Sequence, residues 1–204
     1  MSDRTGGQLV VDTLLAHGVT TAFGVPGESY LAVLDALHDV DDRLRLVTTR
    51  HEGAASFMAE AWGKLTGEPG VCLVTRGPGA TNASIGVHTA AQNSSPMVLL
   101  VGQVPTEHRG REAFQEIDYH AFFGSVAKQV VEIDDVDRAG ALLADAFAAA
   151  VTGRPGPVVV SLPEDMLTDR SASPPGRPRA APLPAPAPDD IEAIEELLAT
   201  AERP

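Results

Sequence analysis

The chain has 204 residues, of which 44% are hydrophobic and 4% aromatic, so it can form a globular core filled mainly by alanine, valine and leucine. Its 28 acidic and 15 basic residues give a formal net charge of −13, which argues against nucleic acid and anionic membranes as partners. The single cysteine, Cys72, excludes an intrachain disulfide and a cysteine-based zinc site. No apolar run reaches the roughly 18 residues of a membrane span, and the N-terminus lacks the layout of a signal peptide, so we expect a cytoplasmic protein.

Stretches with helical and strand periodicity alternate along the chain. The predicted strands cover 21–25, 44–49, 70–75, 96–104, 127–133 and 156–162. The predicted helices cover 7–17, 30–37, 54–65, 79–93 and 137–151. Residues 105–125 have no clear period and are expected to form a loop with one helical turn.

Several of the predicted strands are continuous runs of valine and leucine, which is typical of strands buried on both faces. The segments between them are long enough for helical crossovers. The sequence therefore predicts a three-layer α/β/α fold with a six-stranded, mostly parallel sheet and helices on both faces. Cys72 lies within one of these runs and is expected to be a small core residue.

The composition changes after Leu167. Residues 171–188 contain seven of the sixteen prolines and have no period, so they predict an extended, semi-rigid linker. An amphipathic helix follows, with Asp189 as its expected N-cap. We expect a first domain over 1–170, a Pro/Ala-rich linker over 171–188 and, over 189–204, the first helix of a truncated central domain.

Ligand sites in parallel sheets lie beyond the carboxyl ends of the strands, which selects residues 24–29, 49–53 and 75–82. Glu52, in the second of these segments, has two explanations. A carboxylate in the first turn of a helix interacts favourably with the helix dipole, which is a purely structural role. In a crevice of low dielectric, beside small residues that leave room for a bulky ligand, the same carboxylate can share a proton with a ring nitrogen.

The other segments also allow two interpretations each. "TRGPGATN" is either a phosphate cradle or a tight turn; it has Asn82 in place of the third glycine of a dinucleotide fingerprint, and no P-loop lysine. "GVPGES" is either a ligand-facing loop or a Pro-Gly type II turn. Phe114 and Gln115 either face a substrate or belong to a packed surface loop. The six histidines show no ligand spacing, so no metal site is expected.

Several segments, taken together, resemble the N-terminal pyrimidine-binding domain of thiamine-diphosphate-dependent enzymes. They are "FGVPGES", "RHEGAASFMAEAWGKLTGEPGVCLVTRGPGATN", "SPMVLLVGQVP", "AFQEID" and "GRPGPVVVSLPEDM". The resemblance runs from about Gly7 to Met166 and is closest to the acetolactate synthase large subunit and related carboligases and decarboxylases. It implies the thiamine-diphosphate-binding fold, thiamine diphosphate as cofactor and a 2-keto acid as substrate.

The resemblance also implies roles for single residues. Glu52 would hydrogen-bond the aminopyrimidine ring and support the imino tautomer, which removes the thiazolium C2 proton. The residues expected to border or line the pyrimidine crevice are Val25, Pro26, Gly27, Gly77, Pro78, Gly79 and Asn82. The residues that match positions at the substrate entrance are Phe114, Gln115 and Lys128.

Other parts of the site are expected outside this chain. The family holds the diphosphate and Mg²⁺ in a C-terminal domain through a Gly-Asp-Gly motif, which is absent from this sequence. The cofactor lies between domains of two subunits, so a homodimer or tetramer is expected, and FAD stays possible.

Residues 53–57 depart from the Gln-Gly-Ala-Gly-His that follows the glutamate in synthases. That departure leaves open a thiamine-diphosphate lyase or decarboxylase. The sequence is also compatible with the pyrimidine-binding subunit of a split enzyme and with a non-catalytic regulatory relative.

Overall fold

The computed structural model describes residues 3–180 and 185–203. Its centre is a six-stranded sheet in the order β3-β2-β4-β5-β7-β6, and every neighbouring pair of strands is parallel. The strands are β2 (Thr21–Gly24), β3 (Arg45–Thr48), β4 (Gly70–Val74), β5 (Met97–Gln103), β6 (Gln129–Glu132) and β7 (Pro157–Pro163). All six predicted strands are therefore confirmed.

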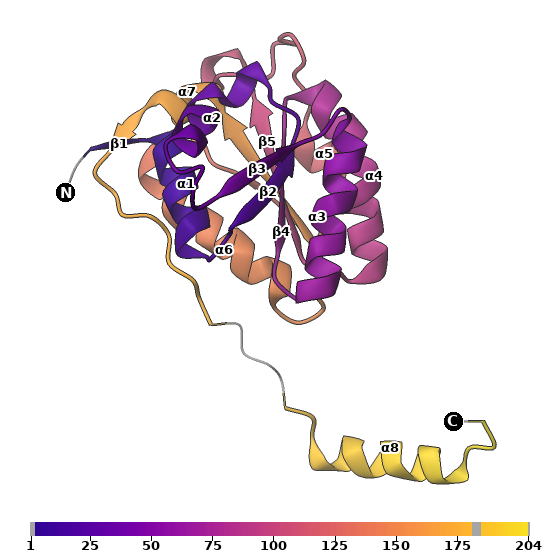
Figure 1. The fold of residues 1–204 in the computed structure, drawn as a ribbon. Helices are drawn as coiled ribbons and strands as arrows, with labels where there is room; N and C mark the ends of the chain where they lie inside the picture. The colour runs from indigo at the N-terminus through magenta and orange to yellow at the C-terminus, as the bar shows by residue number, and fades with distance from the viewer. Residues whose placement is uncertain (1–2, 181–184, 204) are drawn as a thin grey trace.

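Helices cover both faces of this sheet, which confirms the three-layer α/β/α prediction (Figure 1). One layer consists of α1 (Gly6–Ala16), α2 (Leu31–His38) and α6 (Ala139–Val151). The opposite layer consists of α3 (Glu52–Thr66), α4 (Gly77–Asn93) and the short α5 (Tyr119–Phe123). Short 3-10 turns cover 28–30, 106–108 and 136–138.

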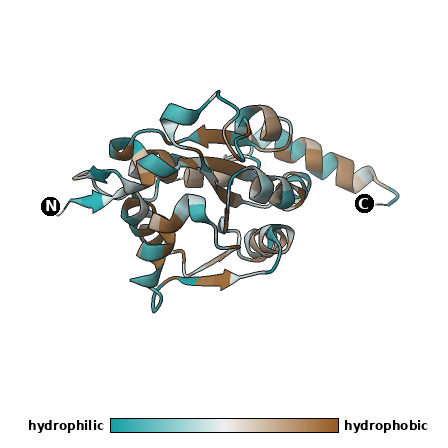
Figure 2. Cartoon of the chain, turned by 90° about the horizontal axis from the view of Figure 1, so that it is seen from above, coloured by the Kyte–Doolittle hydropathy of each residue, from teal (hydrophilic) through white to brown (hydrophobic). Residues whose placement is uncertain are grey.

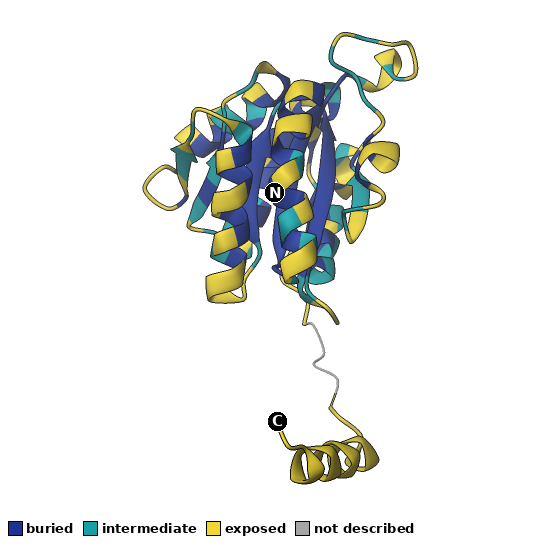
Figure 3. Ribbon diagram, turned by 90° about the vertical axis from the view of Figure 1, so that its right-hand side faces the viewer, coloured by how far each residue is buried: buried dark blue, intermediate teal, exposed yellow. Residues whose placement is uncertain are grey.

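The hydrophobic core lies on both sides of the central strands. Every residue of β4, β5 and β7 is buried, whereas the outer strands β3 and β6 are only partly buried. Figure 3 shows the buried sheet between helices that expose their outer faces, and Figure 2 shows that the strands are largely apolar. Cys72, in β4, is fully buried, as predicted.

Several local features differ from the prediction. Helix α4 begins two residues earlier than expected, at Gly77, because Pro78 suits the first turn of a helix. A short helix, α7 (Glu164–Thr168), follows β7 and was not predicted. The segment 105–125 contains a 3-10 turn in addition to α5, so it is more ordered than a loop with a single turn.

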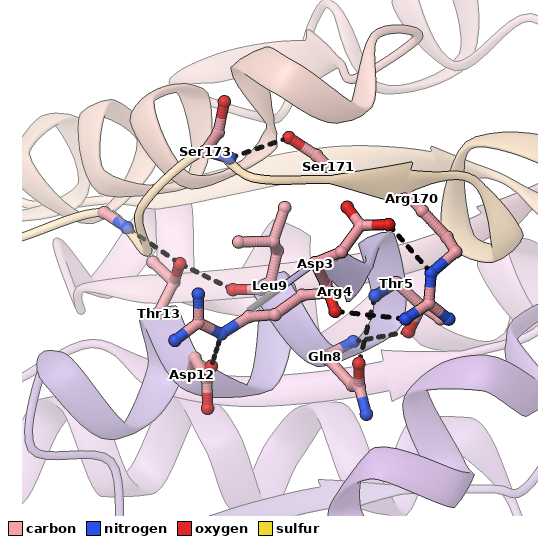
Figure 4. Close-up of polar contacts among 11 residues, drawn as sticks. Asp3, Arg4, Thr5, Gln8, Leu9, Asp12, Thr13, Arg170, Ser171 and Ser173 are labelled. Atoms are coloured by element: carbon pink, nitrogen blue, oxygen red, sulfur yellow. Dashed lines mark hydrogen bonds and ion pairs between the residues drawn. The ribbon is translucent and has the colours of Figure 1, made fainter. Parts of the chain in front are cut away.

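A second, two-stranded sheet joins the start of the chain to the segment that leaves the domain. Strand β1 (Arg4–Thr5) pairs antiparallel with β8 (Arg170–Ser171). The Arg170 side chain donates to Asp3, with Nε 3.0 Å from Oδ2. Further along, the Gly176 amide donates to the Thr13 hydroxyl at 3.0 Å (Figure 4). Residues 171–176, expected as linker, thus lie against α1 and α6.

The last helix, α8 (Pro188–Thr200), carries its predicted apolar face. Its four large apolar residues are between 44% and 68% exposed; they are Ile191, Ile194, Leu197 and Leu198. The expected N-cap is wrong, because the helix begins at Pro188 with Ala187 at the cap, which places Asp189 in the first turn. Over the residues that the structure describes, no helix is long and apolar enough to cross a membrane.

Candidate active site

The carboxyl ends of β2, β3 and β4 bring the three selected segments to one edge of the sheet. The Thr49 amide, after β3, donates to the Gly24 carbonyl at the end of β2, with a distance of 2.9 Å. The Val25 amide donates in turn to the Leu73 carbonyl in β4. Parallel strands thus place the segments beside one another, as expected.

Glu52 is the first residue of α3 and is half-buried. His51 caps this helix, because its ring Nδ1 accepts the Gly53 amide at 3.0 Å. The Glu52 carboxylate accepts a hydrogen bond from Asn82, with Oε2 2.9 Å from the amide nitrogen Nδ2. Among the described residues, Oε1 of Glu52 has no donor. The structure therefore unites two of the predicted residues and leaves one carboxylate oxygen available.

The charge of Glu52 acts on two buried acidic groups, one in β4 and one in the 3-10 turn after β2. Burial raises the pKa of the Cys72 thiol well above its ordinary value, and the nearby Glu52 carboxylate adds to this effect. Burial is also the main reason why the pKa of Tyr30 is raised, with smaller contributions from Cys72 and Glu52. The Tyr30 hydroxyl donates to the Val25 carbonyl. Both groups stay neutral beneath Glu52 and add no competing charge.

The loop after β2 does not contain the type II turn that its Pro-Gly pair suggested. Gly27 has φ −144° and ψ 151°, an extended conformation, whereas a type II turn needs a positive φ at this position. Glycine is required for another reason: a Cβ on Gly27 would lie 2.6 Å from Cβ of Thr75. The loops after β2 and β4 therefore touch at this residue.

The loop after β4 leads directly into α4. The Gly77 amide donates to the Gln115 carbonyl at 2.9 Å, and a Cβ on Gly77 would lie 2.7 Å from that oxygen. A Cβ on Gly79 would approach Val74 and Thr75 within 3.2 Å. Because the first amide of the helix is already paired, this turn is not a free phosphate cradle.

Phe114 and Gln115 lie next to this helix start. Gln115 adopts a positive φ of 67°, and its carbonyl holds the Gly77 amide. Phe114 exposes 76% of its surface. The loop 113–116 thus places an exposed aromatic ring beside the glycine turn.

Lys128 is the one predicted site residue that lies elsewhere. It directly precedes β6, so it lies at the amino-terminal edge of the sheet, opposite to Glu52. Its ammonium group donates to the carbonyls of Thr152 and Arg154, just beyond the end of α6. Partial burial lowers the pKa of Lys128. Within this chain, Lys128 therefore lies apart from Phe114 and Gln115.

Two charged clusters were missed by sequence reasoning. Arg76, which precedes Gly77, is buried and donates from Nη2 to Oε2 of Glu164 at 2.9 Å, while Nη1 lies 3.6 Å from Oε1 of Glu28. The partners are 48 and 88 residues away, and local spacing gives no signal for such pairs. Glu60, buried in α3, accepts from Asn93 and Ser95 and joins α3 to the end of α4.

A hollow of about 520 Å³ lies beside loop 105–118 rather than at Glu52. Two of its charged groups are paired with protein atoms: Arg109 pairs with Glu132, and Glu116 accepts the amides of Gly110 and Ala113. Among the described residues, no group of three or more His, Cys, Asp or Glu side chains is arranged to hold a metal ion.

Comparison with known proteins identifies relatives. Residues 4–122, more than half of the chain, match the family described as "Thiamine pyrophosphate enzyme, N-terminal TPP binding domain". Acetolactate synthase of Bacillus subtilis (strain 168) is 41% identical over 200 residues, covering 98% of this chain and 35% of the relative. Acetolactate synthase isozyme 3 large subunit of Escherichia coli (strain K12) is 44% identical over 174 residues, covering 85% of this chain and 30% of the relative.

A eukaryotic protein is similar to the same extent. The mitochondrial acetolactate synthase catalytic subunit of Saccharomyces cerevisiae (strain ATCC 204508 / S288c) is 42% identical over 162 residues, covering 79% of this chain and 23% of the relative. The chain thus spans about a third or less of the length of these relatives.

Proposed function

Because the chain belongs to the thiamine pyrophosphate enzymes and forms their N-terminal TPP-binding domain, we propose that Glu52 binds and activates the aminopyrimidine ring of the cofactor in an acetolactate-synthase-like enzyme. The complete enzyme would decarboxylate a 2-keto acid and transfer the product to an acceptor. A cytoplasmic location is part of this proposal, and the free thiol of Cys72 is compatible with a reducing compartment.

The observation that carries the proposal is the Glu52–Asn82 hydrogen bond at the ligand end of the sheet. Asn82 fixes one carboxylate oxygen, and the other oxygen has no donor among the described residues, as a ring nitrogen would require. Gly53, Ala54 and Ala55 follow Glu52 without bulky side chains. The unpaired carboxylate oxygen and the small residues after Glu52 therefore suit an aminopyrimidine.

The residues of the chain have distinct tasks in this scheme. When bound, thiamine diphosphate supplies the carbon nucleophile that attacks the keto acid. Glu52 shares a proton with the ring nitrogen, and Asn82 keeps the carboxylate oriented. The proposed walls of the crevice are Val25, Pro26, Gly27, Gly77, Pro78 and Gly79. Phe114 and Gln115, beside Gly77, are proposed to face the entering substrate.

The test is Glu52→Gln in the full-length enzyme, with Glu60→Gln as a matched control on the same helix. The amide keeps the size of Glu52 but removes the charge, so the rate of C2 proton exchange in bound cofactor should fall by about 10²–10⁴-fold. NMR follows this exchange. Glu60→Gln disturbs only the contacts of a buried side chain with Asn93 and Ser95, so it should lower the thermal midpoint and leave the exchange rate within about twofold.

The opposite pattern would refute the proposal. If Glu52→Gln lowers the thermal midpoint by the equivalent of up to about 1 kcal/mol and leaves exchange unchanged, the carboxylate only interacts with the helix dipole.

The rest of the enzyme is proposed to supply what these residues lack. Further domains of the same protein would bind the diphosphate and Mg²⁺, and FAD if the enzyme uses it. Helix α8 supports this view, because its apolar face is exposed and needs a partner surface (Figure 3). We expect the 204-residue chain alone to have no activity and little affinity for thiamine diphosphate. Micromolar binding in calorimetry with Mg²⁺ present would contradict this.

Self-association into a homodimer or tetramer is also proposed. Helices α3 and α4 expose apolar side chains on the layer next to Glu52, with Phe57 at 41%, Met58 at 43% and Ile85 at 53%. A partner surface would cover them and close the crevice. Light scattering of the full-length enzyme should give a mass of two chains or more, and a mass of one chain at high concentration would disprove the idea.

A further inference from the structure

We infer that Arg76 is a positioning residue that ties the loop 24–30 to the loop 75–79 and thereby sets the width of the crevice beside Glu52. The inference rests on the proposed function, because the crevice matters only if a ligand enters it. Arg76 and its carboxylate partners are not among the residues to which the proposed function gives a role.

Arg76 connects the ends of three strands. It follows β4, whereas Glu28 lies in the turn after β2 and Glu164 begins α7 after β7. The Arg76 side chain is 10% exposed, and its two carboxylate partners are 67% and 42% exposed. A buried cation thus holds two carboxylates that approach it from the surface.

Contacts between adjacent residues strengthen the same junction. The hydroxyls of Ser29 and Thr75 are hydrogen-bonded at 3.0 Å, directly beside the Glu28–Arg76 pair. Gly27 packs so closely on Thr75 that a Cβ would lie 2.6 Å away. Three consecutive residues of the first loop therefore contact two consecutive residues of the second.

An arginine at this position would be unfavourable without such a role. Arg76 occupies the N-cap of the 17-residue helix α4, where the helix dipole disfavours a cation. Burial of a guanidinium is also unfavourable unless carboxylates pair with it. Its Nε has no acceptor among the described residues, so the contacts with Glu164 and Glu28 must hold the charge. Only arginine can present a planar fork to two carboxylates at once.

The first test measures amide hydrogen exchange in the 204-residue chain, without cofactor. The reporters are the amides of Val25, Tyr30 and Gly77, which lie in the two loops and donate to the carbonyls of Leu73, Gly27 and Gln115. The Gly156 amide, at the opposite edge, is the reference. Arg76→Met should raise exchange of the three reporters by about tenfold, the size expected when a charge-assisted hydrogen bond is lost. Exchange at Gly156 should not change.

Variants of the partner residues distinguish the loss of this contact from misfolding caused by replacing a buried arginine. Glu164→Gln and Glu28→Gln change exposed partners and keep the fold, and each should raise exchange of the reporters by about threefold. Arg76→Lys keeps the charge and should recover part of the protection. Arg4→Met, which breaks a half-buried pair with Asp12 at 2.7 Å on the opposite helical layer, is the matched control and should leave the reporters unchanged. Unchanged reporters in Arg76→Met, or a rise that includes Gly156, would overturn the inference.

The second test measures the dissociation constant of thiamine diphosphate for the full-length enzyme, by calorimetry with Mg²⁺. Arg76→Met should weaken binding by about tenfold, while Arg4→Met should not change it. Parallel measurements on Glu52→Gln separate the two proposals. If Glu52→Gln alters C2 proton exchange and Arg76→Met leaves binding intact, only the role of Arg76 falls. If Glu52→Gln has no effect on exchange, the proposed function itself falls.

Discussion

The two edges of the sheet differ in the sign of the charged groups at the helix termini and in how fully these groups are hydrogen-bonded. At the amino-terminal edge, where helices end, Lys128 and Arg154 donate to backbone carbonyls near the ends of α6 and α4. At the carboxyl-terminal edge, where helices begin, Glu52 and Asp118 lie at helix N-termini, and Asp118 accepts the Ala121 amide. Cations near helix ends and anions near helix starts are both favourable. The difference is that Glu52 keeps one oxygen without a donor among the described residues.

This comparison shows how the direction of the strands separates the edge of the proposed site from the edge where the helices end. At the amino-terminal edge, Lys128 and Arg154 are hydrogen-bonded to carbonyls at helix ends, so their role is structural. At the carboxyl-terminal edge, one oxygen of Glu52 has no donor among the described residues. Arg76, at the N-cap of α4, is a cation where the helix dipole favours an anion. A charge that local helix chemistry does not explain is the better candidate for function.

The largest expected contrast comes from glycine substitutions at the two edges. Gly77→Ala would place a Cβ 2.7 Å from the Gln115 carbonyl, so the loop must shift at a cost of about 1–3 kcal/mol. Gly156→Ala, at the other edge, would meet only Lys128 side-chain atoms at 3.5 Å or more, and should change stability by less than about 0.5 kcal/mol. Urea unfolding of both variants measures the difference. Equal destabilisation would mean that the two edges are packed alike.

The buried thiol of Cys72, in the middle of the sheet, should make the stability of the domain depend on pH. The pKa of Cys72 is raised in the folded state, so the unfolded thiol, with a pKa of about 8.5, ionises first as the pH rises. Its contribution to stability is complete below this pH and should be lost above it, by about 1.4 kcal/mol per pH unit. Cys72→Ala should flatten the decline of the thermal midpoint between about pH 9 and 10. A decline that persists unaltered would show that Cys72 does not cause it.

Lys128→Met tests whether the charge at the amino-terminal edge is only structural. The substitution removes a donor to the carbonyls of Thr152 and Arg154, so stability should fall by up to about 1 kcal/mol. Because Lys128 lies opposite to Glu52, the activity of the full-length enzyme should stay within about twofold. Thermal unfolding and steady-state rates check both statements. An activity loss without a stability loss would return Lys128 to the substrate entrance.

The sequence was sufficient to predict the sheet and to bring the three selected segments to one edge of it, because both depend on local signals. The valine and leucine runs predict the inner strands, and the position of Glu52 between a strand and a helix follows from a change of period. The pairing of Arg76 with Glu164 could not be predicted, because the two residues meet only through the strand order. The separation of Lys128 from Phe114 and Gln115 could not be predicted for a related reason: a resemblance implies a role, whereas the strand direction decides on which edge a residue lies.

The small sheet of β1 and β8 has a consequence for the order of folding. Arg170 and Asp3 are 167 residues apart, so their contact closes a loop that contains nearly the whole domain. The entropy of such a closure is unfavourable until the main sheet has brought the two ends together. The pair should therefore form after the rate-limiting step, and Arg170→Ala should speed unfolding and leave the refolding rate unchanged in stopped-flow measurements. This contact between the first and last parts of the folded domain would therefore slow unfolding without speeding folding.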